Sequence, residues 1–234
     1  MKRFIVLVLV IALCLPVLSS CKVMDKVTGV FKNPVKDVAK MYSVSEPTKV
    51  VANVKQEAGA LVLNNTYELI TGYVDGVRAS VYTVHTEEID SVENGGATEV
   101  VLPLVKKTDT KTESIEGIGA RVNGGEWNPQ GTIWTIERGG MALNLNKKLV
   151  ENINYEDHVL TFTIPLANAG EVLGEDHAAN ISSDVTATIT DDGAMVTSIE
   201  LVYNIAGNDS KNLPESKMTV KVDYTYDIEQ INIA

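Results

Sequence analysis

The sequence predicts a mainly β protein: an antiparallel meander that forms a curled sheet, a half-barrel or a sandwich, with one or two short helices. The first supporting observation is the unbroken alternation of apolar and polar residues over 217–229, which is the period of a strand with one buried face. The second is the Asp-Gly pair at 75–76 and again at 192–193, because hairpin turns favour this pair. The third is that strand-like segments recur at short spacing, as in meanders, sandwiches and open barrels.

The composition excludes several classes of protein. The chain has 234 residues, of which 22% are charged and 44% hydrophobic, so wholesale disorder is excluded. The formal net charge is -11, which disfavours nucleic acid as a partner because phosphate neutralisation needs a basic face. The two cysteines are too few for a disulfide framework or a zinc site made of thiolates.

The first twenty residues have the pattern of a secretory signal peptide. A basic start at 1–3 is followed by the uncharged run Phe4–Leu18, which is shorter than the roughly 20 residues of a membrane-spanning helix. The run ends in Leu18-Ser19-Ser20-Cys21, which resembles the lipobox of bacterial lipoproteins. The resemblance implies cleavage before Cys21 and attachment of a diacylglyceryl group to its sulfur. It places the protein at the cell membrane or outer membrane, on the extracytoplasmic side.

Residues 21–42 are predicted to be a lipidated basic tether. From residue 22 to residue 42 there are five lysines and two aspartates, a net charge of +3, whereas residues 43–234 carry 13 basic and 29 acidic residues, a net charge of -16. The tether should be attracted to anionic lipid headgroups. Asn33-Pro34 divides it into two short pieces with helical spacing. We expect a semi-flexible spacer; the alternatives are that the second piece packs on the domain or lies on the membrane.

Residues 43–234 are predicted to fold as a single mainly β domain. Its last strand should bury one set of alternate residues, namely Met218, Val220, Val222, Tyr224, Tyr226 and Ile228. Earlier strands are predicted at 48–57, 60–71, 77–86, 160–164, 185–189 and 199–205, where Val, Ile, Thr and Leu are frequent. Two segments interrupt the series as helix candidates. Residues 165–173 would form a short helix starting at Pro165 and weakened by Gly170, and residues 146–151 could form another.

The sequence offers no constellation of residues typical of an enzyme or a metal site. The three histidines, His85, His158 and His177, lack the spacing of zinc ligands and are expected to be solvated residues of loops and strand ends. The acidic pairs Glu87-Glu88 and Asp191-Asp192 are expected on a solvated surface, since the domain is rich in carboxylates. We therefore predict no catalytic activity, no metal and no cofactor.

Two tryptophans flank an Asn-Pro-Gln-Gly loop. Trp134 lies between isoleucines and is expected in the core. Trp127 lies close to Pro129 and is the better candidate for contact with a partner, because an exposed aromatic side chain can anchor an interface.

Two functions remain, and both act by binding. A chain of antiparallel strands behind a lipobox resembles the half-barrel lipoproteins and chaperones that carry lipids in bacterial envelopes. This resemblance implies a carrier or receptor for a lipid or another hydrophobic ligand. The alternative is a surface-display module that contacts envelope proteins or polysaccharide through loops held on a rigid sheet. A packed inner face would favour the module, and an open apolar groove would favour the carrier.

Overall fold

The computed structural model describes residues 33–44, 46–59, 61–90, 104–131, 143–207 and 214–233. Three α-helices and one 3-10 helix accompany ten strands in these residues: α1 (Pro34–Val44), β1 (Lys49–Ala58), β2 (Leu61–Val74), β3 (Val77–Asp90), β4 (Leu104–Ile115), β5 (Gly119–Val122), β6 (Glu151–Glu156), β7 (Val159–Ile164), η1 (Leu166–Asn168), α2 (Ala169–Leu173), α3 (Glu175–Ala178), β8 (Val185–Asp191), β9 (Val196–Ile205) and β10 (Ser216–Thr225). The predicted mainly β class is confirmed.

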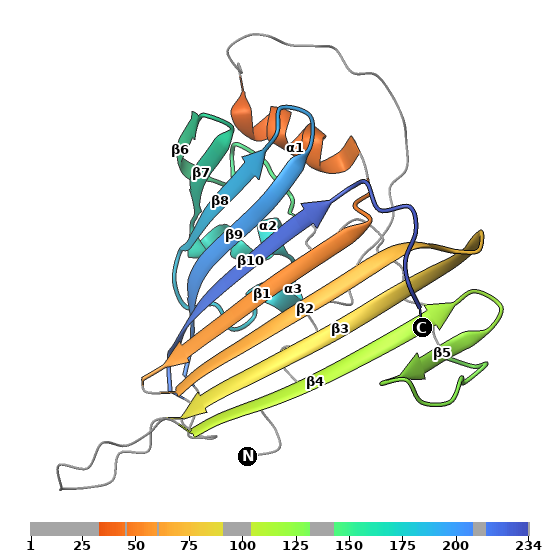
Figure 1. Cartoon of the computed structure of the whole chain (residues 1–234). Coiled ribbons are helices and arrows are strands. Elements are labelled where there is room, and N and C mark those ends of the chain that lie inside the picture. Colours follow the sequence, from red (N-terminus) through yellow and green to blue (C-terminus); the bar gives the residue numbers. More distant parts are fainter. Residues whose placement is uncertain are drawn as a thin grey trace, which may run out of the picture.

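The ten strands form one curled sheet that does not close (Figure 1), in the order β5-β4-β3-β2-β1-β10-β9-β8-β7-β6. Every pairing between neighbours is antiparallel. The sheet therefore consists of two meanders, β1–β5 and β6–β10, which we call the first and second halves. They are joined where β1 pairs with β10 over the stretch from Lys49 opposite Thr225 to Glu57 opposite Lys217.

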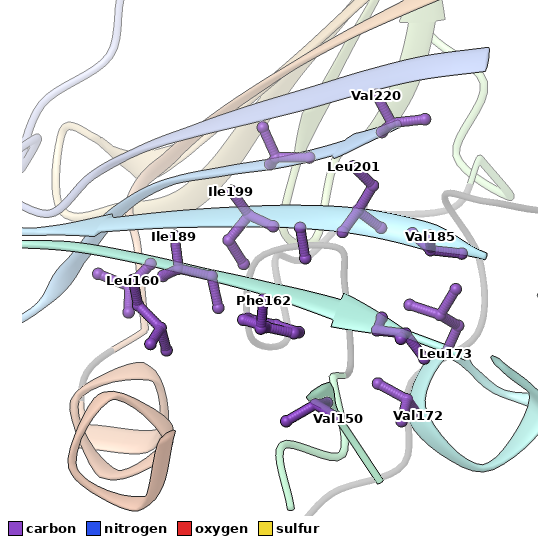
Figure 2. Packing of buried hydrophobic residues seen from close by; sticks show 14 of the residues in the cluster. Val150, Leu160, Phe162, Val172, Leu173, Val185, Ile189, Ile199, Leu201 and Val220 are labelled. Atoms are coloured by element: carbon purple, nitrogen blue, oxygen red, sulfur yellow. The ribbon is translucent and has the colours of Figure 1, made fainter. Parts of the chain in front are cut away.

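The hydrophobic core lies on one face of the second half and extends to Val50 and Val54 of β1. Along β7–β10 the alternate residues on this face are almost fully buried: Leu160, Phe162, Ile164, Val185, Ala187, Ile189, Val196, Ile199, Leu201, Met218, Val220, Val222 and Tyr224. Figure 2 shows several of them, among them Leu160, Ile199 and Leu201, pointing from the strands towards the layer that contains Val150 and Val172. We call this side of the whole sheet the inner face and the opposite side the outer face.

Helix α1 is part of the folded domain. Asn33 precedes it, and its side-chain Oδ1 accepts a hydrogen bond from the Lys36 amide at 3.3 Å, as an N-cap residue does. Val35 and Val38 are 1% and 0% exposed within the core, and the Tyr42 ring packs edge-on against Tyr224. Of the alternatives for this segment, packing on the domain is therefore correct, and the folded unit includes residues from Pro34 onward.

The strand predictions at 48–57, 60–71 and 77–86 correspond to β1, β2 and β3. The strand predicted to reach Glu229 ends at Thr225; the first four of its predicted core residues are buried, whereas Tyr226 and Ile228 are half-buried. Beyond β10 the chain crosses to β2, where the Tyr73 amide donates to the Glu229 carbonyl at 3.0 Å.

The two helix candidates had different outcomes. Residues 165–173 form η1 and α2, which ends where Gly174 adopts a φ of +92°, a conformation that favours glycine. The prediction of a helix at 146–151 was wrong. The Asn146 side chain accepts a hydrogen bond from the Lys148 amide at 3.0 Å, and its carbonyl accepts one from Leu149 at 2.9 Å. These bonds hold a turn, and β6 follows it.

A candidate ligand-binding face

The inner face of the first half is the strongest candidate site. Strand register places its residues, because residues opposite each other in an antiparallel sheet point to the same side. Between the rung of Leu63, Glu88 and Lys106 and the rung of Tyr73 and Arg78, this face consists of Val50, Ala52 and Val54 of β1, Asn65, Tyr67, Leu69 and Thr71 of β2, Ser80, Tyr82, Val84 and Thr86 of β3, and Thr108, Thr110, Thr112 and Ser114 of β4. None of these side chains is charged. We call this set the uncharged inner face.

The middle of the uncharged inner face is half-buried. Tyr67, Leu69, Tyr82 and Val84 are all of intermediate exposure, unlike the buried core residues of the second half. Burial and the neighbouring Tyr82 raise the pKa of Tyr67 to about 12, so its phenol is neutral across the physiological range. Burial also raises the pKa of Tyr82. The surroundings of these two rings are therefore poorly hydrated, and Tyr67 packs against the edge of the hydrophobic core.

Two polar side chains of this face are buried. Asn65 is 6% exposed, and its side-chain Oδ1 accepts a hydrogen bond from the Thr86 hydroxyl at 2.8 Å. Ser80 is 1% exposed, and its hydroxyl has no hydrogen-bond partner among the described residues. Uncharged donors and acceptors are thus embedded in this otherwise apolar and threonine-rich surface.

The outer face of the same strands has the opposite character. Ion pairs cross it from strand to strand: Lys49 to Glu68 at 2.9 Å, and Lys107 to Glu87 at 3.1 Å. Charged side chains on a sheet face are typical of contact with water. The two faces of the first half therefore meet different environments.

Trp127, the predicted partner contact, lies beside β5. The Ala120 amide and carbonyl each bond to Asn128, so the segment containing Trp127 runs antiparallel to β5. The Arg121 guanidinium lies 4.9 Å from the centre of the Trp127 ring, within the range of a cation–π contact. The indole is half-buried rather than fully exposed.

A buried carboxylate supports this stack. The Glu113 side chain is 5% exposed and lies 2.6 Å from Arg121 Nε and 2.7 Å from Lys111 Nζ. Burial alone would raise the pKa of Glu113, but the hydrogen bonds and charges of Lys111 and Arg121 outweigh burial and hold the pKa below its usual range. Glu113 therefore stays ionised and fixes Arg121 against the tryptophan.

The histidines lie apart from the uncharged inner face. His85 Nδ1 lies 2.7 Å from the exposed Asp109 on the outer face. His158 Nδ1 lies 2.9 Å from the buried Asp191 carboxylate, which also accepts a hydrogen bond from the Tyr155 hydroxyl at 3.0 Å. These contacts link the β6–β7 and β8–β9 turns. Within the described ranges, no three His, Cys, Asp or Glu side chains are arranged to hold a metal ion.

Sequence reasoning had missed both the His158–Asp191 contact and the uncharged inner face. Asp191 was expected on a solvated surface, but it is 4% exposed, because it continues the inward-facing series of β8. The lipidation site Cys21 and the predicted core residue Trp134 lie outside the described residues. Among the residues that are described, none of the helices has the length and apolarity needed to span a bilayer.

The fold defines a class of protein: a single curled antiparallel sheet with helices packed on one half of its inner face. No protein-family model matches the sequence, and no curated protein matches it. Among solved structures, a DUF1329 family protein from Desulfovibrio piger is similar with 8% identity and a TM-score of 0.28, over 86% of this chain and 94% of that chain. A porin-like protein from Bacteroides uniformis is similar with 13% identity and a TM-score of 0.26, over 77% and 96% of the two chains. These values are too low to assign a family.

Proposed function

We propose that this protein is a lipid-anchored binding protein of the bacterial cell envelope, and that it holds a hydrophobic ligand of the lipid class on its uncharged inner face. The observation that carries the proposal is the difference between the two faces of β1–β4. One face has cross-strand ion pairs, and the other has no charged side chain between the Glu88–Lys106 rung and Arg78. In a domain with a net charge of -16, chance does not readily produce such a face.

The chemistry of the face indicates the kind of ligand. Leucine, valine and tyrosine side chains offer apolar surface, and the removal of such surface from water is favourable by about 25 cal/mol per Å². Thr110 and Thr112 on β4, with Asn65 on β2, add uncharged hydrogen-bonding groups. A few polar groups within an apolar surface are typical of small-molecule sites. The complementary ligand is an amphiphile with hydrocarbon chains and an uncharged polar part.

The N-terminal sequence supports the cellular setting of this proposal. Leu18-Ser19-Ser20-Cys21 resembles a lipobox, and a lipidated Cys21 would hold the domain at a membrane. One acyl chain gives marginal membrane binding, whereas two or three anchor a protein stably. A protein held there has a constant supply of lipid within reach.

The proposal is tested by the lipid that accompanies the protein. The mature protein would be purified from membranes in mild detergent, exchanged into a second detergent, and analysed by native mass spectrometry for bound lipid. We expect a stoichiometric lipid adduct in addition to the covalent anchor. A protein that carries no adduct, and takes none up from added diacylglycerol, would contradict the proposed function.

A matched pair of variants on β3 locates the ligand. Val84 lies on the uncharged inner face, and its chain neighbour Thr83 lies on the outer face; both are half-buried. Val84→Glu should reduce the lipid adduct at least about tenfold, because a buried unpaired carboxylate is costly against hydrocarbon. Thr83→Glu should leave the adduct unchanged. Melting temperatures of both variants would confirm that they are folded.

A display module remains the second candidate, and the Trp127 stack favours it. Arg121 is held by Glu113 at 2.6 Å and covers one face of the indole. The ring is therefore kept in one orientation, which reduces the entropy cost of binding a partner. In this alternative, Trp127→Ala would abolish capture of an envelope partner, and Val84→Glu would have no effect on that capture.

A further inference from the structure

Both ends of the folded chain meet one edge of the sheet, which we call the entry edge. It contains the start of β1, the turns β2–β3, β4–β5, β6–β7 and β8–β9, and the end of β10. Helix α1 ends at Val44, just before β1 begins at Lys49, and Tyr42 packs on Tyr224 near the end of β10. Helix α1, which follows the anchor-bearing segment in the chain, therefore ends at the entry edge (Figure 1).

Two neighbouring hairpin tips at this edge expose large apolar side chains. Tyr73 and Val77 flank the β2–β3 turn and are 49% and 41% exposed, and Ile118 in the β4–β5 turn is 49% exposed. The Glu116 amide donates to the Arg78 carbonyl at 2.9 Å, which joins the two tips. Figure 1 places them side by side, beyond the end of the first half.

We propose that these two hairpin tips, through Tyr73, Val77 and Ile118, contact the lipid bilayer that holds the anchor. This inference rests on the proposed function, because it requires the lipid anchor at Cys21. Only eleven residues lie between Cys21 and Asn33, a span of at most about 40 Å when fully extended. The strands of the first half are about as long, since β2 has 14 residues at about 3.3 Å each. The tether therefore favours the entry edge over the opposite edge as the membrane-facing one.

Charge at the entry edge determines which lipids this contact suits. The two tips carry Asp75 and Glu116 against Arg78, all three exposed, so they gain nothing from an anionic surface. The turns of the second half add Asp157 and Asp192, which an anionic surface repels. The contact is therefore apolar and suits a zwitterionic bilayer, with tyrosine at the interface between headgroups and acyl chains.

Single cysteines would test the contact, since the sequence has no cysteine after Cys21. Val77→Cys and Ile118→Cys would be made in the full mature lipoprotein, labelled with an environment-sensitive fluorophore, and reconstituted in phosphatidylcholine vesicles containing brominated acyl chains. Val105→Cys is the matched control, because Val105 is 44% exposed on β4 at the opposite edge.

We expect fluorescence at positions 77 and 118 to fall about twofold in brominated vesicles, since interfacial side chains lie about 5–10 Å deep, and fluorescence at 105 to stay unchanged. Protein that sediments with vesicles but shows no quenching at 77 and 118, or equal quenching at 105, overturns the contact alone. Protein that does not sediment with vesicles overturns the anchor and the contact together. Loss of the lipid adduct on the uncharged inner face would leave this result unaffected, so the two proposals fail separately.

Discussion

The two halves of the sheet have the same antiparallel pairing but differ in what lies on their inner faces. In the second half, Leu160, Ile189 and Ile199 are at most 1% exposed, and they share one core with residues of α1 and α2. In the first half the strands are longer, yet Leu63, Tyr82 and Val84 at equivalent inward positions are half-buried. Strand alternation is thus present in both halves, but among the described residues the nearly fully buried inward side chains lie mainly in the second half.

This difference suggests a division within one sheet: the second half stabilises the domain, and the first half provides the proposed binding face. Close packing of apolar side chains supplies most of the free energy of folding, so the second half can stabilise the domain. The first half is tied to it through the β1–β10 pairing and can keep a less filled inner face. The following predictions test this division, from the largest expected effect to the smallest.

The strongest test places a charge in the core of the second half. Val222 on β10 is 3% exposed, so Val222→Asp buries an unpaired carboxylate and should cost several kcal/mol, enough to unfold a domain with about 5–15 kcal/mol of stability. Lys221→Asp on the outer face should change the free energy of unfolding by less than about 1 kcal/mol. Circular dichroism during chemical denaturation would measure both. Equal effects would mean that the faces of β10 are wrongly assigned.

A pair of identical substitutions compares the two inner faces directly. Leu160→Ala in the second half, where the side chain is 0% exposed, should cost about 2–5 kcal/mol because it leaves a cavity. Leu63→Ala in the first half, where the side chain is half-buried, should cost about 1 kcal/mol or less in lipid-free protein. Denaturant midpoints would measure both. A similar cost at the two sites would indicate that the first half has a closed core of its own.

The Glu113 ion pairs should make stability depend on pH. Glu113→Gln should cost about 1–3 kcal/mol at pH 7, because Arg121 loses a partly buried partner. The folded-state pKa of Glu113 is lowered from its ordinary value of 4.5, so this stabilisation is present above that value and is lost as the pH falls through the folded-state pKa. Thermal unfolding between pH 3 and pH 7 should show the wild type converging on the variant in acid. A constant difference over that range would contradict the assignment.

The smallest expected effect concerns the Trp127 stack. A double-mutant cycle of Arg121→Ala and Trp127→Leu should give a coupling energy of about 0.5–1 kcal/mol, measured by denaturant unfolding. Additive effects would mean that the 4.9 Å approach of guanidinium and ring does not contribute to stability.

The second half was largely predictable from the sequence. On β10, Val220 and Val222 alternate with Thr219 and Lys221, and β8 and β9 show the same pattern. Apolar alternation is a direct consequence of one buried face. The Asp192-Gly193 signal also located the β8–β9 turn, where Gly193 has a φ of +89°.

The first half was less predictable, because its outer strand lacks that signal. On β4, Thr108, Thr110 and Thr112 alternate with Asp109 and Lys111, so both faces are polar in sequence, and no strand was predicted there. The uncharged inner face becomes evident only when register aligns the threonines with Val84 and Tyr82 of β3. The short strands β5 and β6 were also missed. The alternation of apolar and polar residues does not reveal a strand such as β4, in which one face has threonines and the other has charged residues.

The pairing of the first strand with the last has a consequence for how the chain folds. Each meander forms from contacts close in sequence, but the β1–β10 ladder joins residues as distant as 49 and 225. Contacts of such high separation slow folding, because the intervening chain must be ordered first. If the chain is exported from its N-terminus, β1 has no partner until β10 has crossed the membrane. In that case the two halves join in the final step of folding, and until then each half has an unpaired edge strand that is prone to aggregation.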